Sequence, residues 1–470
     1  MPHAVSMPAP GLQALILCGP GSSFPTFTAN PDENPKALLP IANRPMVWYP
    51  IEFCYRSGIT NITLVCPPSA AEAITTALNT NPFLTGLPHP HPDLLAPKDL
   101  DYNTGTAEIL RLPELQEVIT SDFIVLPCDL VCELGGDRLL QAWMVKAASL
   151  TNLLDDEDSS TPNGGMGVWY ETKTENPIKG EETDLIATSP MPPSSAPISM
   201  DSLLPHLSYL TYSMPTDSLR DLTDEKGIFP IRHGLLRKHP KLRMLTTHRD
   251  AHIYILPKWI LDFIQRNERL ETIGEDVIGW WAKASWQTGL FDKLGFKFIL
   301  DSTSTSESGQ SSHDPATSGE YEGSASPTGS QERSQRAPHE PFPKRQDCLV
   351  ADNVVVEEKT SIKESVIGAN CVIKEGAKLF QCLLMDGVVV GKGCKLTRCI
   401  LGKRSEVGEG STLTNCEVQE NLLVEPRTDD KDNKLMSSSG LEASEQEMQD
   451  VLQKMDDGNS IEDGESALVD

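Results

Sequence analysis

Short apolar runs alternate with longer amphipathic stretches between Leu12 and Leu300. The apolar runs are bounded by Gly, Pro or Asp, as buried strands of a parallel sheet are. Strands are expected at residues 14–18, 62–66, 123–127, 166–172 and 251–256. Intervening helices are expected at residues 45–57, 70–78 and 138–149. The alternation predicts an α/β domain with a mostly parallel sheet over residues 12–300. Two polar stretches, near 155–165 and 174–204, are expected to be surface insertions.

A different period governs residues 347–425. Aliphatic residues recur there in steps of 6, 6 and 5, so that every position i is repeated at i+17. The series runs Val350, Val356, Ile362, Ile367, Ile373, Leu379, Leu384, Val390, Leu396, Leu401, Val407 and Leu413, with Gly at 368, 391, 402 and 408. Three short strands per turn with stacked aliphatics predict a left-handed parallel β-helix of hexapeptide repeats.

The same period orders several cysteines. Cys382, Cys399 and Cys416 follow one another at i, i+17 and i+34, and Ser365 is the fourth member of the series. They are expected to form a ladder of small side chains at one corner of the β-helix. A disulfide or metal site there is the alternative, although a single-file ladder lacks the arrangement of a tetrahedral site.

Two further segments are poor in apolar residues. Residues 301–346 contain eleven Ser and predict a disordered linker. Residues 426–470 hold 13 Asp and Glu against 4 Lys and Arg, without an aromatic residue, and predict a disordered acidic tail.

Charge and cysteine usage exclude several classes of protein. The net charge of −27 argues against binding nucleic acid or an anionic membrane surface, which requires clustered Lys and Arg. Eleven cysteines without a CxxC pair favour reduced thiols and a cytosolic location. No apolar run near the start is long enough for a membrane anchor. The stretch from Arg232 to Arg249 is locally basic; it can be a contact for an acidic partner or an ordinary solvated helix face.

Three segments of the α/β domain carry candidate chemistry. A strand delivers Gly19 and Gly21 in a turn that frees the backbone for an anion, and "NPKALLP" places Lys36 to reach a phosphate. A second turn, "TGTAEIL", opens a helix, and "IVLPCD" ends a buried strand where a magnesium carboxylate would lie. The candidate nucleotide-binding residues are Gly19, Gly21, Lys36, Gly105, Thr106, Ala107 and Asp129.

Together these segments resemble the Rossmann-like nucleotidyltransferase domain of sugar-nucleotide pyrophosphorylases. The family loop reads Gly-x-Gly-x-Arg-Leu, but the arginine position is Ser23 here and the leucine position is Phe24. Losing a preorganised cation of this kind costs on the order of 100-fold in rate. Residues 262–286 also lack a convincing motif for the second metal-binding Asp. Catalysis is therefore expected to be lost, leaving a vestigial site with no cofactor beyond possible weak GTP or ATP binding.

The β-helix raises the alternative of a hexapeptide acyltransferase, which uses a His as general base. All ten His of the chain lie at or before His339, so the predicted β-helix contains none. This excludes the acyltransferase class.

A non-catalytic nucleotidyltransferase fold followed by a β-helix resembles the gamma subunits of eukaryotic translation initiation factor 2B. The similarity covers roughly residues 12–300 and 347–425, including "PKALLPIANRPMVWYPIEFCYRSGI" and "SIKESVIGANCVIK". Epsilon subunits share this layout but carry a further helical exchange domain, for which about 45 residues after the β-helix are too few.

This resemblance implies a regulatory or scaffold role in a guanine nucleotide exchange complex. The implied partners are the epsilon subunit, the beta, delta and alpha subunits, and initiation factor 2 as substrate. Two alternatives stay open: an active sugar-1-phosphate nucleotidyltransferase, such as a mannose-1-phosphate guanylyltransferase, and a subunit that senses a nucleotide without chemistry.

Overall fold

The computed structural model of the chain describes residues 11–19, 24–28, 30, 32–101, 103–147, 164–173, 181–191, 202–287, 289–299 and 348–437. The chain divides into two compact units. The first consists of residues 1–20, 35–38 and 45–335, and the second of residues 21–34, 39–44 and 336–470. Two short segments of the expected first domain therefore group with the β-helix. The predicted linker and the chain from residue 438 onward lie outside the described residues.

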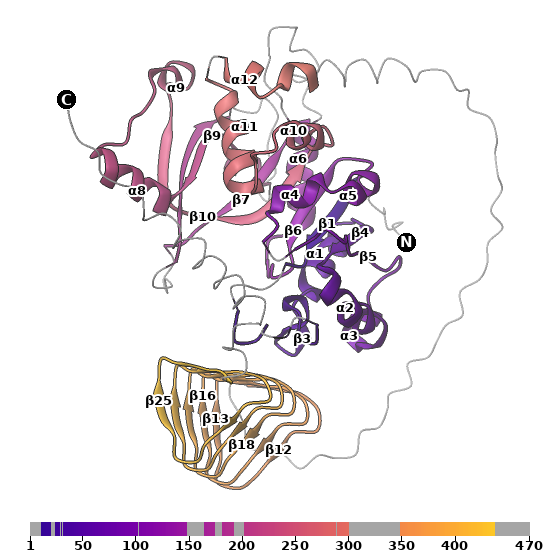
Figure 1. The fold of residues 1–470 in the computed structure, drawn as a ribbon, viewed down its shortest axis with the longest axis vertical. Helices are drawn as coiled ribbons and strands as arrows, with labels where there is room; N and C mark the ends of the chain where they lie inside the picture. The colour runs from indigo at the N-terminus through magenta and orange to yellow at the C-terminus, as the bar shows by residue number, and fades with distance from the viewer. Residues whose placement is uncertain are drawn as a thin grey trace, which may run out of the picture. The chain divides into compact units, whose positions relative to one another are not determined.

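The first unit is an eight-stranded mixed sheet with helices on both faces (Figure 1). Its strands are β1 (Gln13–Leu17), β4 (Asn61–Val65), β5 (Asp93–Leu95), β6 (Phe123–Pro127), β7 (Met166–Glu171), β8 (Asp184–Pro190), β9 (Ser208–Pro215) and β10 (Arg243–Leu256). Its α-helices are α1 (Trp48–Arg56), α2 (Pro68–Thr80), α3 (Pro82–Thr85), α4 (Thr106–Arg111), α5 (Pro113–Val118), α6 (Gly136–Ala147), α8 (Thr216–Lys226), α9 (His233–Lys238), α10 (Ile260–Arg266), α11 (Ile278–Ala284) and α12 (Leu290–Lys293). Shorter elements are η1 (Lys36–Leu38), η2 (Leu204–His206) and the π-helical η3 (Ile273–Val277), and the hairpin strands β2 (Pro40–Ile41) and β3 (Arg44–Pro45) lie nearby in sequence.

The strand order places a switch point beside the first strand. The sheet runs β5-β4-β1-β6-β10-β8-β9, and β7 pairs with β10 outside this path. The chain thus builds outward from β1 to β5 on one side and then crosses to β6 on the other, as in doubly wound folds. The pairings β5–β4, β4–β1 and β1–β6 are parallel, and those from β10 onward are antiparallel. The predicted α/β class is confirmed, with parallel pairing confined to these four strands.

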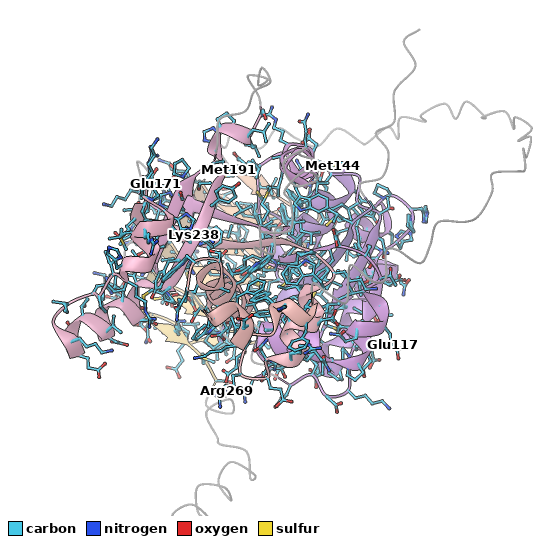
Figure 2. The ribbon with its side chains drawn as sticks, turned by 90° about the horizontal axis from the view of Figure 1, so that it is seen from above. Glu117, Met144, Glu171, Met191, Lys238 and Arg269 are labelled. Atoms are coloured by element: carbon cyan, nitrogen blue, oxygen red, sulfur yellow. The ribbon has the colours of Figure 1, made fainter. Side chains whose placement is uncertain are left out.

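Alternation along the central strands explains the two helical layers. In β1, Ala14 and Ile16 face one hydrophobic core, while Leu15 faces the other. Helices α1, α2 and α6 cover the first core, and α4, α5, α10 and α11 cover the second. Because both faces are buried, the strand reads as a continuous apolar run. Side chains fill the layers between, and Glu117 and Arg269 point outward at the rim (Figure 2).

The prediction of a surface insertion at residues 174–204 is wrong for part of that range. Residues 184–190 form β8, which pairs with both β9 and β10, and Leu185, Ile186 and Ala187 are buried. The short apolar run of this strand is surrounded by polar residues, which lower the average hydrophobicity of the segment. Residues 155–163 of the other expected insertion lie outside the described part of the chain.

The basic stretch is likewise not one helix face. Helix α9 ends at Lys238, and β10 begins at Arg243. Pro240 lies between them and has no N–H to continue a helix.

The second unit contains the predicted left-handed β-helix, made of three stacks of short parallel strands. One stack is β11 (Leu349–Val350), β14 (Val366–Ile367), β17 (Leu383–Leu384), β20 (Ile400–Leu401), β23 (Glu417–Val418) and β26 (Lys434–Leu435). The second is β12 (Val355–Val356), β15 (Val372–Ile373), β18 (Val389–Val390), β21 (Glu406–Val407) and β24 (Leu423–Val424). The third is β13 (Ser361–Lys363), β16 (Lys378–Phe380), β19 (Lys395–Thr397), β22 (Thr412–Thr414) and β25 (Asp429–Lys431).

The β-helix continues beyond the predicted boundary at residue 425. Strands β25 and β26 lie in what the sequence predicts to be the disordered tail, so that prediction is wrong for residues 426–437. The reason is Asp430, which pairs in register with Leu413 and takes the place of an aliphatic residue in the repeat. The period itself persists, since Val424 and Leu435 pair in register with Val407 and Val418 of the preceding turn.

Each turn of the β-helix bends at residues in the left-handed backbone region. These corners are Asn353, Lys359, Glu364, Asn370, Gly376, Gln381, Gly387, Gly393, Arg398, Arg404, Gly410, Asn415, Asn421, Arg427 and Asp432. Only four of them are Gly, and a residue with a Cβ gives up about 1–2 kcal/mol there. Hydrogen bonds between corners one turn apart oppose this cost, for example Arg404 Nε to Asn421 Oδ1 at 2.9 Å and Asn415 Nδ2 to Asp432 Oδ1 at 2.8 Å.

The cysteine ladder is a packing feature. Cys382, Cys399 and Cys416 are buried, and each thiol donates to the carbonyl two residues before it, at 3.3, 3.3 and 3.4 Å. Ser365 makes the equivalent bond to Lys363 O at 2.7 Å. All eleven cysteines are free thiols, so the disulfide alternative is wrong.

Over the part of the chain that the structure describes, no helix combines the length and apolar character needed to cross a bilayer. Within that same part, no cluster of three or more His, Cys, Asp or Glu side chains is arranged to hold a metal ion.

Two neighbouring glycines of the β-helix should differ in their sensitivity to alanine. A Cβ on Gly391 would lie 2.6 Å from Val407 O, whereas one on Gly393, at φ +69°, would meet nothing within 4 Å. Gly393→Ala should therefore cost only the left-handed strain, about 1–2 kcal/mol. Gly391→Ala must push two turns apart and should cost about 3 kcal/mol or more. Urea unfolding of both variants measures the difference; equal losses would contradict the close approach.

Candidate functional site

The candidate nucleotide site lies at the carboxyl ends of β1 and β6. The two strands are parallel neighbours, with Leu17 opposite Pro127, so the chain leaves both at the same edge of the sheet. Gly19 follows the first strand and Asp129 the second. In open α/β sheets, ligands bind at this edge beside the switch point. The topology therefore brings the strand-end candidates together, as the sequence motifs predict.

Lys36 and Asp129 form an ion pair at this edge. The Lys36 Nζ lies 2.8 Å from Asp129 Oδ2, with side-chain exposures of 15% and 36%. The lysine expected to contact a phosphate is thus held by the carboxylate expected to bind magnesium. An ion pair with this much solvent access contributes about 1 kcal/mol or less. A competing anion could displace Asp129 at that small cost, so the pair alone does not close the site.

The second turn is fixed by its own surroundings. Gly105 is the N-cap residue of α4, and its N–H donates to Glu108 Oε2 at 2.7 Å. The Ala107 N–H donates to Glu271 O at 2.9 Å, and Thr106 Oγ1 accepts from the Ile273 N–H at 2.9 Å. Two groups of this candidate nucleotide-binding turn, the Ala107 N–H and Thr106 Oγ1, therefore bond to residues 271 and 273.

Gly105 and Gly19 differ in whether the structure requires glycine at the position. A Cβ on Gly105 would lie 2.2 Å from Glu271 O, so only glycine fits this close approach. Gly19 has no atom within 4 Å of its Cβ position, and neither crowding nor a left-handed backbone requires glycine there. Gly21 and Ser23 lie outside the described residues, so the nucleotide-binding role of Gly21 and the effect of Ser23 at the arginine position stay predictions.

A buried acidic group next to this edge was not predicted from the sequence. In β10, the Asp250 N–H donates to Asp184 Oδ2 at 2.8 Å, and the His252 N–H donates to Asp250 Oδ1 at 2.8 Å. The Tyr254 hydroxyl also donates to Asp250. The strand is irregular between Asp250 and Tyr254, where His252 has a φ of +54°. Burial raises the pKa of the Asp250 carboxyl, while His252 and the Tyr254 hydrogen bond oppose the rise.

The same segment that holds the second turn reaches this acidic group. A Cβ on Gly274 would lie 2.6 Å from the Tyr254 hydroxyl and 2.9 Å from Asp250 Oδ2. Gly274 belongs to the π-helical η3, a rare conformation that is frequent at functional sites. The sequence gives only a weak indication of this acidic group, because Gly274 is the one residue that marks the close contact with Tyr254 and Asp250.

The loop after β1 belongs to the second unit. Residues 21–34 and 39–44 cluster with the β-helix, and Thr26, Phe27, Thr28 and Asn34 are buried. Thr26 Oγ1 donates to Glu417 Oε2 at 2.8 Å, and Asn43 Nδ2 donates to Ile367 O at 3.2 Å. The segment that resembles a phosphate loop is therefore a structural part of the β-helix unit.

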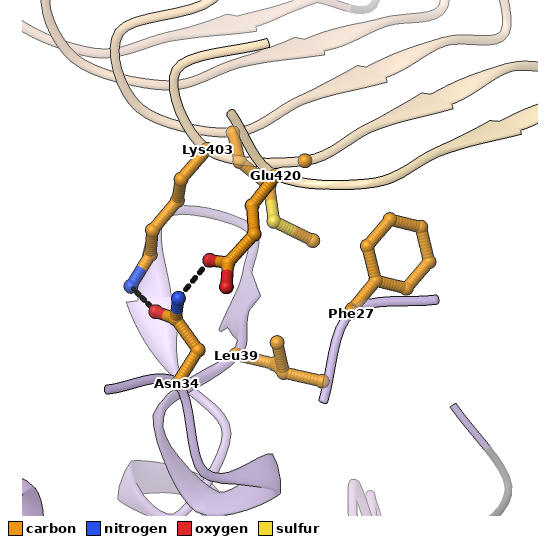
Figure 3. Close-up of a pocket in the computed structure, with 7 residues that line it drawn as sticks. Phe27, Asn34, Leu39, Lys403 and Glu420 are labelled. Carbon is orange, nitrogen blue, oxygen red and sulfur yellow. Dashed lines mark hydrogen bonds between the residues drawn. The ribbon is translucent and has the colours of Figure 1, made fainter. Parts of the chain in front are cut away.

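Asn34 is the centre of this contact (Figure 3). Its Oδ1 accepts from Lys403 Nζ at 2.8 Å, and its Nδ2 donates to Glu420, so that one amide joins a cation to a carboxylate. An amide carries its donor and its acceptor on two separate atoms, so Asn34 can bond to both charged groups at once. Burial lowers the pKa of Lys403 and raises that of Glu420. Phe27, Leu39 and Met385 enclose the group on its apolar side.

Comparison with known proteins supports the resemblance seen in the sequence. Residues 344–429 match the family described as "EIF2B subunit epsilon LbH domain". The chain is 27% identical over 290 residues to the "Translation initiation factor eIF2B subunit gamma" of Schizosaccharomyces pombe, covering 62% of this chain and 55% of the relative. The chain resembles eIF2B subunit gamma.

A second relative with the same name extends this finding. The eIF2B subunit gamma of Caenorhabditis elegans is 23% identical over 269 residues, covering 57% of each chain. The chain thus spans just over half the length of the curated relatives it matches. The match to the epsilon-type β-helix family agrees with the left-handed β-helix of the second unit.

Replacing Asn34 should destabilise the β-helix unit. Asn34→Ala would leave Lys403 and Glu420 without the amide between them, at a cost of about 2 kcal/mol or more, because buried charges lose a partner. Asn30 also donates to Glu420, but it is exposed and its bond is 3.4 Å. Asn30→Ala should therefore cost less than about 1 kcal/mol. Hydrogen exchange at amides of β20 and β23 reports the loss; an unchanged exchange rate in Asn34→Ala would show that the amide is dispensable.

The raised pKa of Asp250 gives a pH dependence with a definite sign. The carboxyl, which faces Asp184, His252, Tyr254 and Glu275, stabilises the fold when protonated. Its contribution is complete below the ordinary pKa of 3.8 and is lost as the pH rises through the raised value. Asp250→Asn should not show this loss. The melting temperature of Asp250→Asn minus that of the wild type should increase as the pH rises above 3.8 and through the raised pKa of Asp250. A difference that is flat or falls with pH would contradict the burial of this charge.

Proposed function

We propose that the chain is a non-catalytic scaffold subunit of the translation initiation factor 2B exchange complex. In this proposal it pairs with the epsilon subunit in the cytosol and promotes exchange of GDP for GTP on initiation factor 2. The beta, delta and alpha subunits complete the larger complex. The similarity to relatives named eIF2B subunit gamma carries the proposal.

The geometry of the α/β unit supports a non-catalytic role. Phosphoryl transfer depends on cations and metal ions aimed at the phosphates. Here Lys36 pairs with Asp129, the Ala107 N–H donates to Glu271 O, and Thr106 Oγ1 accepts from the Ile273 N–H. The sequence has Ser23 at the arginine position of the pyrophosphorylases. These features favour a fold retained for its surfaces over an active sugar-1-phosphate nucleotidyltransferase.

Affinity purification of the tagged full chain from its own cells tests the assignment. Mass spectrometry should recover the other four subunits in comparable amounts, together with initiation factor 2 at low salt. A matched preparation of Asn34→Ala, which leaves the α/β unit unchanged, shows whether the β-helix unit takes part in the assembly. A solitary chain or a homo-oligomer would overturn the proposal.

The absence of catalysis is tested separately. The purified chain, incubated with mannose 1-phosphate or glucose 1-phosphate, GTP or ATP, and magnesium, should release no pyrophosphate above the rate of a Lys36→Ala control. Turnover that Lys36→Ala abolishes would establish an active nucleotidyltransferase instead.

One observation favours nucleotide sensing as a second candidate. The Lys36–Asp129 pair is partly exposed, and no atom of the described residues lies within 4 Å of the Cβ position of Gly19, so within this part of the chain a phosphate could reach the pair. Isothermal titration with GTP and GDP tests this candidate: binding that Lys36→Ala weakens about tenfold or more would support it, and absence of heat at millimolar nucleotide would reject it.

A further inference from the structure

The first unit carries an exposed set of basic and apolar side chains that the candidate site does not use. It is formed by the exposed residues Ile228, Ile231, Leu236, Arg237, Lys241 and Arg243, here named the 228–243 patch. Helices α8 and α9 lie beyond β9 and β10 at one edge of this unit (Figure 1), and the patch includes α9 and the segments on either side of it.

The charge of this segment is opposite to that of the chain. Between Gly227 and Arg249 there are six Lys and Arg and no Asp or Glu, in a chain whose net charge is −27. Among the described residues, Arg237, Lys241 and Arg243 make no ion pair. The pKa of Lys283 is lowered mainly by burial. The positive charge of Arg232 lowers it further.

Large aliphatic side chains accompany these cations. Ile228 is 68% exposed, Leu236 47% and Ile231 44%. Single exposed apolar residues are common, but several close together in one segment mark an interaction surface. Leu235, next in sequence to Leu236, is buried, so α9 places one leucine in the unit and presents the other to solvent.

The patch is held in place by its own anchors. The Lys238 Nζ, labelled in Figure 2, donates to Ser285 O at the end of α11. Phe229 packs edge-on against Tyr212 of β9, with ring centroids 6.1 Å apart. Two contacts to regular elements mean that a partner need not order the whole segment, which lowers the entropy cost of binding.

We propose that the 228–243 patch binds an acidic, amphipathic polypeptide segment of a partner protein. Charge complementarity selects the acidic groups, and the exposed Ile and Leu side chains require aliphatic residues between them. The remaining negative charge of the chain opposes an acidic partner only weakly beyond about 8 Å at physiological salt. A nucleic acid fits less well, because residues 228–243 include no exposed Phe, Tyr or Trp side chain on which bases could stack. The inference does not depend on the proposed function.

Fluorescence anisotropy on the full chain tests this proposal. The probe is a labelled synthetic peptide of about 16 residues with Glu and Leu at helical spacing, and a peptide of the same composition with the Leu positions scrambled is the comparison. The chain should bind the amphipathic peptide about tenfold or more tightly than the scrambled one. The triple variant Arg237→Glu/Lys241→Glu/Arg243→Glu should lose about tenfold or more in affinity.

Matched variants distinguish binding at the 228–243 patch from a general effect of the net charge. Lys363→Glu/Lys378→Glu/Lys395→Glu changes the net charge equally at exposed β-helix positions and should lose less than about twofold. Leu236→Ser should weaken binding several-fold without lowering the melting temperature, because the side chain is exposed. Circular dichroism of every variant confirms folding.

Four outcomes would overturn the inference. The first is an equal loss in both triple variants, and the second is no effect of Leu236→Ser. The third is tighter binding and competition by a single-stranded RNA oligonucleotide of similar length. The fourth is a large gain in peptide affinity on deleting residues 438–470, which would make the acidic end of the chain itself the occupant.

Discussion

One buried amide fixes the use of the loop that follows the first strand. Asn34 joins the Lys403 ammonium to the Glu420 carboxylate in the β-helix unit, and Thr26 donates to Glu417 close by in sequence. Taking a carboxylate out of water costs several kcal/mol unless donors replace the lost hydration. Neutral hydroxyl and amide groups supply such donors without adding a further buried charge. This explains why a loop resembling a phosphate cradle contains no Lys or Arg between Gly19 and Lys36.

At the edge of the α/β sheet, too, polar groups bond to other groups of the protein. Ala107 donates to Glu271, Thr106 accepts from Ile273, and Lys36 pairs with Asp129. In a catalytic site the corresponding groups are preorganised and available to bond to the charge that develops during the reaction. Here they stabilise the fold instead. The contacts described for Lys36, Thr106 and Ala107 are thus made to other residues of the same unit.

Most of the architecture could be predicted because it depends on periodicity, whereas the site depends on tertiary contacts that carry no period. The prediction of the β-helix ended one turn early because Asp430 occupies an aliphatic position, where backbone pairing outweighs the loss of one apolar contact. β8 was missed because its burial depends on pairing with β9 and β10. The motif order placed Lys36 and Asp129 at one candidate site, but it did not predict that they would form an ion pair. No pattern indicated that Asn34 would bond to Lys403, 369 residues later, because an amide in a loop is common.

The free-energy costs of nucleotide binding and of catalysis at this site differ in size. The partly exposed Lys36–Asp129 pair opposes an incoming phosphate by about 1 kcal/mol or less, a factor of roughly five in affinity. Catalysis requires much more, because each missing preorganised donor or cation costs on the order of 100-fold in rate. Nucleotide affinity can therefore outlast turnover by a wide margin in such a fold. The shape of the site requires neither property, because it is supported by packing on both faces of the sheet.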